Sequence, residues 1–102
     1  MNGNSMHLTR SQSRFRRDRL PPPEDYFART GLKLSGRGQW RDALCPFHND
    51  TRPSLRVRLE TGAFRCMACG AHGGDVLAFH MQHNRLQFVE AARDLGAWEA
   101  ER

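Results

Sequence analysis

Two motifs, Cys45-Pro46-Phe47-His48 and Cys66-Met67-Ala68-Cys69, decide the fold of this chain. Each motif places two metal-binding side chains three positions apart, so one tight turn can present both to a metal ion. Residues 49–65, between the motifs, suffice for two strands and a hairpin that bring the two pairs together. Three cysteines and one histidine are typical of structural zinc, because four protein ligands fill the tetrahedron. The sequence therefore predicts one structural zinc ion.

Other interpretations of these residues stay open. His72 follows closely behind the second motif and could replace His48 as the fourth ligand. Cys66 and Cys69 alone could form a redox pair, although the βαβ pattern of thioredoxin-like folds is missing. A disulfide framework is disfavoured, since the chain has 3 cysteines and one thiol would be left over.

The size of the chain makes a metal useful for folding. It has 102 residues, of which 38% are hydrophobic, so it has room for one domain with a small core. A structural zinc site contributes roughly 10–16 kcal/mol of apparent binding free energy near neutral pH, which is folding free energy for a marginal domain. We expect the zinc ion to be what lets this domain fold.

The middle of the chain predicts three short strands, at residues 40–44, 54–59 and 63–66. The second strand alternates cleanly, with Leu55 and Val57 on one face and Arg56 and Arg58 on the other. Residues 60–62 form a hairpin-type turn into the third strand. Because the strands follow one another through short turns, we expect an antiparallel sheet.

Helices are expected before and after these strands in the chain. Residues 24–29 follow three prolines and carry acids in the first turn, which predicts a short N-terminal helix. Asp75 is the expected N-cap of a first C-terminal helix. Apolar side chains at helical spacing predict a second one: Phe88, Ala91, Ala92 and Leu95. The predicted fold class is α+β, an antiparallel sheet with one N-terminal and two C-terminal helices.

Positive charge gathers at the N-terminus. The chain has 16 Lys and Arg against 11 Asp and Glu, a formal net charge of +5. Residues 1–20 are polar and rich in Ser and Arg without a sustained period, so we expect a disordered basic arm, with the prolines 21–23 as a stop. We place the domain at residues 24–98 and a disordered tail at residues 99–102.

The chain has no segment that suits a membrane or secretion. Its apolar runs are far shorter than the roughly 20 residues of a membrane span, and no apolar stretch follows the N-terminal arginines as in a signal peptide. Together with the odd number of thiols, this favours a soluble, cytoplasmic protein with no membrane partner.

Basic and aromatic residues surround the second predicted strand. The candidate DNA-binding residues are Arg52, Arg56, Arg58, Phe64 and Arg65. Trp40 is a further aromatic nearby. A basic surface with aromatic platforms is how sequence-tolerant binding of single strands is built. The alternative is that the arginines are the solvated face of a half-buried sheet, with Phe64 and Trp40 in the core.

The combined motifs resemble the zinc-binding domain of bacterial-type DNA primases. The resemblance covers residues 24–97 and is carried by both ligand motifs and by residues 53–57, 64–70, 73–76 and 88–91. It implies a zinc-ribbon antiparallel sheet flanked by helices, with zinc held by Cys45, His48, Cys66 and Cys69. It also implies contact with single-stranded template DNA. The sequence departs from the family at Leu55 and Met67, where the family often has an aromatic residue.

The function expected from this resemblance is that of a free-standing, zinc-binding, single-stranded-DNA-binding module in replication priming. Its partners would be a primase polymerase domain or a replicative helicase on another chain, in a plasmid, phage or other mobile genetic element. No cluster of acids is present to hold Mg²⁺ for phosphoryl transfer, so no catalytic centre is visible in the sequence and enzymatic activity stays open. The alternative is a protein-docking or regulatory zinc finger without direct template recognition.

Overall fold

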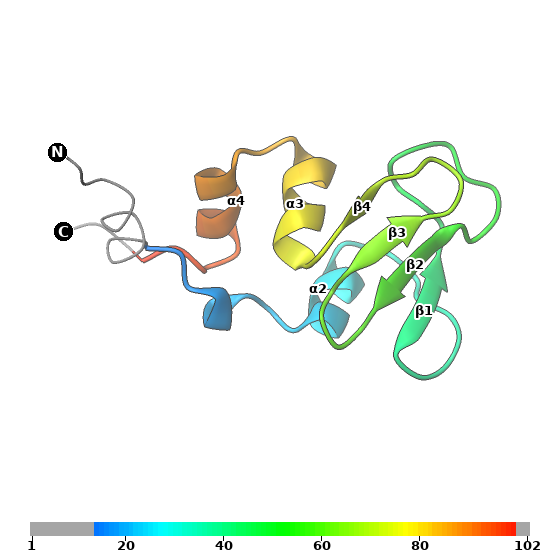
Figure 1. Cartoon of the computed structure of the whole chain (residues 1–102), viewed down its shortest axis with the longest axis horizontal. Coiled ribbons are helices and arrows are strands. Elements are labelled where there is room, and N and C mark those ends of the chain that lie inside the picture. Colours follow the sequence, from blue (N-terminus) through cyan, green and yellow to red (C-terminus); the bar gives the residue numbers. More distant parts are fainter. Residues whose placement is uncertain (1–13, 100–102) are drawn as a thin grey trace, which may run out of the picture.

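The structure, a computed structural model, describes residues 14–99. In this range the elements, in chain order, are η1 (Arg17–Arg19), α2 (Pro23–Arg29), β1 (Trp40–Ala43), β2 (Leu55–Arg58), β3 (Phe64–Cys66), β4 (His72–Gly73), α3 (Val76–Asn84) and α4 (Phe88–Asp94). Figure 1 shows the sheet at one end of the molecule and the first and last described segments at the other, with α3 between the sheet and α4. The predicted α+β class is confirmed.

The four strands form one antiparallel sheet in the order β1-β2-β3-β4. In β2, Leu55 and Val57 are buried and Arg56 is exposed, as the alternating pattern predicts. The strand β4 was not predicted, because two residues are too few to show alternation. The sheet therefore has one face on the core and one face toward solvent.

The core lies between this sheet and the helices α2 and α3. Phe79 of α3 is fully buried, and its ring lies 5.0 Å from the rings of Phe27 and Phe64 and 5.1 Å from that of Phe47, measured between centroids. A side chain at Gly73 would put its Cβ 2.6 Å from Phe64, so β4 can pair closely with β3 only because this residue is glycine. These contacts fix the sheet, and with it the two ligand turns, against α3.

Local sequence explains how the C-terminal helices begin and end. Asp75 caps α3 as predicted, because its carboxylate accepts a hydrogen bond of 2.8 Å from the backbone N–H of Ala78. Arg85 ends the helix in the left-handed region, at φ 56°. The helix α4 opens with a capping box, in which the side chains of Gln87 and Glu90 each accept from the other's backbone N–H.

The N-terminal segment differs from the disordered arm that we expected for residues 1–20. From residue 14 on, it packs on the domain. Phe15 pairs with Trp98 and its ring lies 5.1 Å from that of Phe88. Arg16 forms an ion pair with Glu99, whereas the tail was expected to be disordered from that residue on. Residues 1–13 and 100–102 lie outside the described part of the chain.

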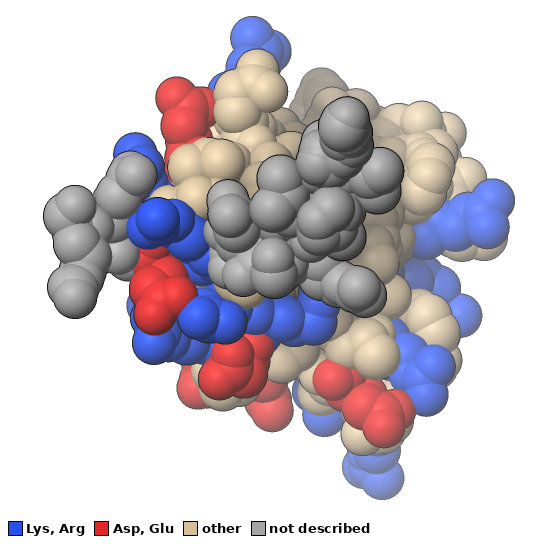
Figure 2. Space-filling view, turned by 60° about the vertical axis from the view of Figure 1, so that its left-hand side comes forward, with Lys and Arg blue, Asp and Glu red and all other residues tan. Residues whose placement is uncertain are grey.

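The reason for this difference is that a few apolar side chains interrupt an otherwise polar segment. Phe15 and Leu20 pack against a small cluster of buried residues that includes Leu77, Ala91 and Ala92. Arg17 also reaches the cap of α3, with its guanidinium 2.6 Å from the Asp75 carboxylate. Figure 2 looks onto this end of the molecule, where Lys and Arg side chains lie beside Asp and Glu side chains. The basic segment is therefore partly neutralised where it packs.

None of the helices within residues 14–99 is long and apolar enough to cross a membrane.

Candidate metal centre

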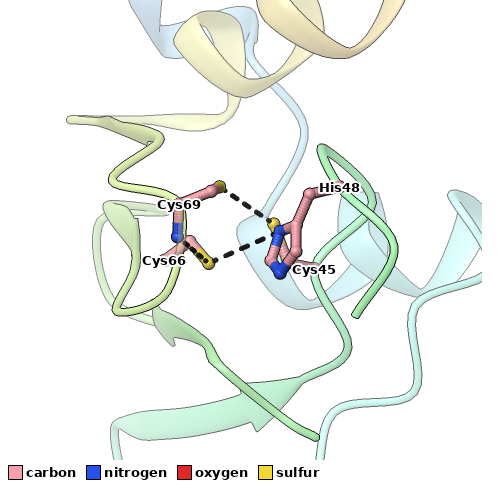
Figure 3. A group of neighbouring side chains, drawn as sticks. All are labelled: Cys45, His48, Cys66 and Cys69. Atoms are coloured by element: carbon pink, nitrogen blue, oxygen red, sulfur yellow. Dashed lines mark hydrogen bonds between the residues drawn. The ribbon is translucent and has the colours of Figure 1, made fainter. Parts of the chain in front are cut away.

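The two ligand motifs meet at one end of the sheet. Cys45 follows β1 and His48 lies in the turn after it, while Cys66 ends β3 and Cys69 lies in the next turn. One ligand atom from each of these four side chains lies within 4.8 Å of all the others. In Figure 3 the four side chains point toward one another from two separate turns. The hairpin between the motifs thus brings the two pairs together.

The distances between these atoms suit zinc. The Sγ atoms of Cys45 and Cys69 are 3.8 Å apart, and Sγ of Cys66 is 3.9 Å from Nδ1 of His48. A tetrahedral zinc ion with Zn–S bonds of about 2.3 Å requires sulfurs about 3.8 Å apart. The donor set, three thiols and one imidazole, is also a common one for structural zinc. The residues therefore fit the ion in both geometry and chemistry.

Backbone N–H groups surround the sulfurs in both turns. Sγ of Cys45 accepts from the N–H of Phe47 at 3.4 Å, and Sγ of Cys66 accepts from those of Ala68 at 3.4 Å and Cys69 at 3.3 Å. Gly70 closes the second turn at φ 83°, the left-handed conformation that glycine adopts without strain. The turns therefore hold the sulfur atoms in place and also direct the partial positive charge of backbone N–H groups at them.

The two buried thiols differ in acidity. Burial raises the pKa of Cys45 to about 12. Burial also opposes ionisation of Cys66, but hydrogen bonds from the N–H groups of Cys69 and Ala68 outweigh it and lower the pKa of Cys66 below its ordinary value. Because zinc binds thiolates, binding of the ion must displace protons from this site.

A residue that the sequence analysis missed, Asp50, supports His48. Its Oδ1 atom lies 3.3 Å from Nε2 of His48, and its Oδ2 atom accepts from the backbone N–H groups of Cys45 at 2.9 Å and Ser54 at 3.2 Å. The hydrogen bond from the Cys45 N–H is the main cause that lowers the pKa of the Asp50 carboxyl. The sequence did contain a signal for this role: Asp50 is an acidic residue two positions after the predicted ligand His48. At that separation a loop can fold back so that the acid lies beside the ligand.

The structure separates His72 from the ligand group. Among the described residues, the group of metal-binding side chains contains His48 and not His72. His72 is exposed on β4, and its Nδ1 atom lies 3.0 Å from the backbone oxygen of Gly70. Of the two candidate fourth ligands, the geometry favours His48.

Comparison with known proteins agrees with this geometry. Residues 27–100 match the description "CHC2 zinc finger". The chain belongs to the CHC2 zinc finger family. Its fold contains one structural zinc ion, as the sequence predicts.

Relatives of this CHC2 finger include much longer proteins. The DNA primase of Escherichia coli (strain K12) is 41% identical over 66 residues, which cover 65% of this chain and 11% of that protein. The Gene 58 protein of Mycobacterium phage D29 is 36% identical over 73 residues, 72% of this chain and 46% of that protein. The CHC2 finger thus spans about a tenth of the length of the primases that it matches.

A solved structure shares the fold. The crystal structure of the Aquifex aeolicus primase, which contains its zinc-binding and RNA polymerase domains, superposes with a TM-score of 0.65 at 30% sequence identity. The match covers 74% of this chain and 18% of that chain. The predicted resemblance to a primase zinc-binding domain is confirmed.

Three of the predicted DNA-binding residues lie together on the solvent face of the CHC2 sheet. The register places Arg56 of β2 opposite Arg65 of β3, and Arg65 opposite His72 of β4. Arg58 lies two residues further along the same face of β2 and pairs with Trp40 of β1. Pairing across neighbouring strands puts side chains on one face within reach of one another. The arginines therefore form one surface, which we call the outer face.

The other two predicted residues do not lie on this face. Arg52 is exposed in the loop between His48 and β2. Phe64 is only 3% exposed, stacks on Phe47 with ring centroids 6.0 Å apart, and contacts Phe79. Of the two roles considered for Phe64, base stacking and core packing, its burial favours the core, because β3 points Phe64 inward and Arg65 outward.

Trp40 was predicted as a core residue or a platform, and the structure places it outside. It is 45% exposed at the start of β1. The guanidinium carbons of Arg56 and Arg58 lie 5.4 Å and 5.9 Å from the centre of its ring. The outer face therefore combines positive charge with one exposed aromatic side chain.

Proposed function

We propose that this CHC2 finger binds single-stranded DNA through the outer face of its sheet, as the template-contacting part of a primase-type priming system. The observation that carries the proposal is the cross-strand set of Arg56, Arg58 and Arg65 beside an exposed tryptophan. Arginine suits this role because its planar guanidinium forms paired hydrogen bonds with phosphate and stacks on rings. Arg52, at the zinc end of the sheet, is a further candidate contact.

The carboxylates near the outer face leave it available to a phosphate chain. Asp42 lies 3.3 Å from Arg56, and Glu60 lies 2.9 Å from Arg58. All four side chains are 43–63% exposed, and ion pairs in such positions contribute only about 0–1 kcal/mol. Among the described residues Arg65 has no ion-pair partner. Phosphates can therefore replace these carboxylates at little cost.

The chemistry of primer synthesis would belong to another part of the system. The primases that resemble this finger are much longer than the finger itself. We propose that it acts with a primase polymerase domain or with a replicative helicase, joined to it or on another chain. The phage relative supports an origin in a mobile genetic element.

The test is a binding titration with fluorescently labelled oligonucleotides of about 12 nucleotides, followed by anisotropy at several salt concentrations. We expect single-stranded DNA to bind more tightly than the matched duplex. Each phosphate contact contributes about −0.7 to the slope of log K against log salt, so Arg65→Ala should reduce the slope by about that amount. Arg93→Ala, at an exposed arginine of α4, is the matched control and should leave the slope unchanged.

The competing function is that of a protein-docking or regulatory zinc finger. If the zinc-loaded chain shows no affinity for any single-stranded oligonucleotide at low salt, the DNA-binding proposal fails. If Arg65→Ala shows the same affinity and salt slope as the Arg93→Ala control, the outer face is not the DNA-binding surface.

A further inference from the structure

We infer that Trp40 is the platform on which the outer face stacks an unpaired DNA base. This inference rests on the proposed function and adds to it the residue that recognises bases. The sequence offered two aromatic candidates near the arginines, and the structure buries Phe64 and exposes Trp40. Of these two candidates, Trp40 is therefore the one that can stack a base on the outer face.

The fold does not need Trp40 for its core. The indole belongs to neither of the two clusters of apolar residues found among the described residues. It is one of four large apolar side chains in this part of the chain that are exposed, with Leu44, Met67 and Phe88. Phe88 is the other aromatic among them, but it lies on α4 and contacts Phe15. An aromatic side chain that is exposed and surrounded by arginines is a feature of binding surfaces more than of folding.

The neighbouring arginines cover the indole ring at the positions where a base would stack. Trp40 is the cross-strand partner of Arg58, and both Arg58 and Arg56 place their guanidinium groups over its ring. Such a group is planar and cationic, so it occupies the surface that a base would use. A stacked base can take the place of a guanidinium, which is then free to bind the phosphate of the same nucleotide. When the guanidinium moves off the indole, one contact within the protein is lost and two contacts with the DNA strand are gained, a stacked base and a bound phosphate.

The chemistry of this platform defines its ligand as an unpaired base of any type. Every base has a π-face, so stacking on an indole is tolerant of sequence. The bases of a duplex are already stacked on their neighbours and are not available. Trp40 would therefore provide the preference for single strands, whereas the arginines provide affinity for phosphate on either kind of DNA.

The fluorescence of Trp40 itself can test the inference. The chain has 2 tryptophans, so Trp98→Phe leaves Trp40 as the single indole. Titration of this variant with an unlabelled single strand should quench its emission, and the matched duplex should quench it far less. If Trp98→Phe weakens folding through its contacts with Phe15 and Phe88, the wild-type chain and Trp40→Phe can be compared instead, since the difference in quenching then reports Trp40.

Binding by the variants of Trp40 separates stacking from charge. Trp40→Leu should weaken binding of single strands about tenfold or more, as expected for the loss of one stacked base. It should keep the zinc ion and the salt slope, because no phosphate contact is lost, whereas Arg65→Ala lowers the slope. Trp40→Phe should restore most of the affinity, which a merely structural role of the indole does not predict.

Two results would overturn the inference. The first is binding of single strands, detected by anisotropy, without quenching of Trp40 and with equal affinities for Trp40→Leu and wild type. In that case the outer face binds DNA through its arginines alone and the proposed function stands. The second is no binding of single strands at all, which overturns the proposed function and the platform with it.

Discussion

Asp50 holds the imidazole of His48 from the side opposite Cys66. Oδ1 of Asp50 lies 3.3 Å from Nε2 of His48, and Nδ1 of the same ring lies 3.9 Å from Sγ of Cys66. The carboxylate thus lies on the Nε2 side of the ring and leaves Nδ1 facing the ligand group, as expected for an acidic residue that fixes the orientation of a ligating histidine. Asp50 also binds the N–H of Cys45, so one carboxylate orients two ligands.

The first prediction concerns this carboxylate. Asp50→Asn should weaken zinc affinity by about 10- to 100-fold, the usual effect of losing a partner of a metal ligand. If the amide oxygen of the variant accepts from the N–H of Cys45, its NH₂ group, without negative charge, faces Nε2 of His48. Competition with a chromophoric chelator measures the affinity. Asp42→Asn, at an exposed carboxylate of the outer face, is the control, and equal affinities of the two variants would contradict the role of Asp50.

The second prediction concerns the ligands. Cys45→Ser, Cys66→Ser and Cys69→Ser should each lose the zinc ion and cooperative unfolding, since the site supplies on the order of 10–16 kcal/mol to a small domain. Elemental analysis of the wild-type chain should find one zinc per chain. For the fourth ligand, His48→Ala should lose the metal while His72→Ala keeps it, and the reverse outcome would reassign that ligand.

The third prediction concerns Tyr26, whose hydroxyl lies 2.8 Å from Nδ1 of His80. Burial, with a smaller contribution from Asp94, raises the pKa of Tyr26 above its ordinary value. The unfolded chain therefore releases this proton first, so the free energy of unfolding should be unaffected by Tyr26 below pH about 10 and should fall as the pH rises further. The chain has 1 tyrosine, so the ultraviolet absorbance of tyrosinate reports this residue alone.

The control for Tyr26 is the variant Tyr26→Phe, in which this part of the pH dependence should disappear. Stability above pH 10 depends on other groups as well, so the informative quantity is the difference between the two proteins. A tyrosinate titration of the folded chain centred at the ordinary pKa would show that burial does not act as described.

Sequence patterns predicted those features that repeat or have fixed spacing. The ligand motifs have the spacing at which one tight turn presents two side chains to a metal ion, and the strand with Leu55 and Val57 alternates with period two. Both patterns depend on near neighbours in the chain. The same alternation also predicted that Arg56 and Arg58 lie on the opposite face of the sheet from Leu55 and Val57.

Features that depend on distant parts of the chain were not predicted. The strand β4 forms only because Gly73 lies against Phe64. Whether Phe64 or Trp40 is exposed depends on which face of each strand meets α3, and composition holds no information on that. Asp50 acts through a loop that folds back on itself, and Phe15 packs on residues at the other end of the chain.

The last prediction concerns this contact between the two ends. The sequence predicts an unstructured arm, and removal of such an arm would not change stability. In the structure, however, Phe15 packs beside Phe88 and Trp98. Phe15→Ala should therefore lower the free energy of unfolding by roughly 1–3 kcal/mol, less than the 3–5 kcal/mol of a fully buried phenylalanine because Phe15 is only half-buried.

Thermal and urea unfolding of the zinc-loaded protein measure this effect. Arg19→Ala, at an exposed residue of the same segment, is the control and should change stability by less than about 0.5 kcal/mol. Removal of residues 1–20 should destabilise the domain at least as much as Phe15→Ala, because it also removes Leu20 from its contact with the cluster around Leu77. If that deletion leaves the melting temperature unchanged, the segment does not pack in solution and the domain begins at residue 24, as the sequence alone suggests.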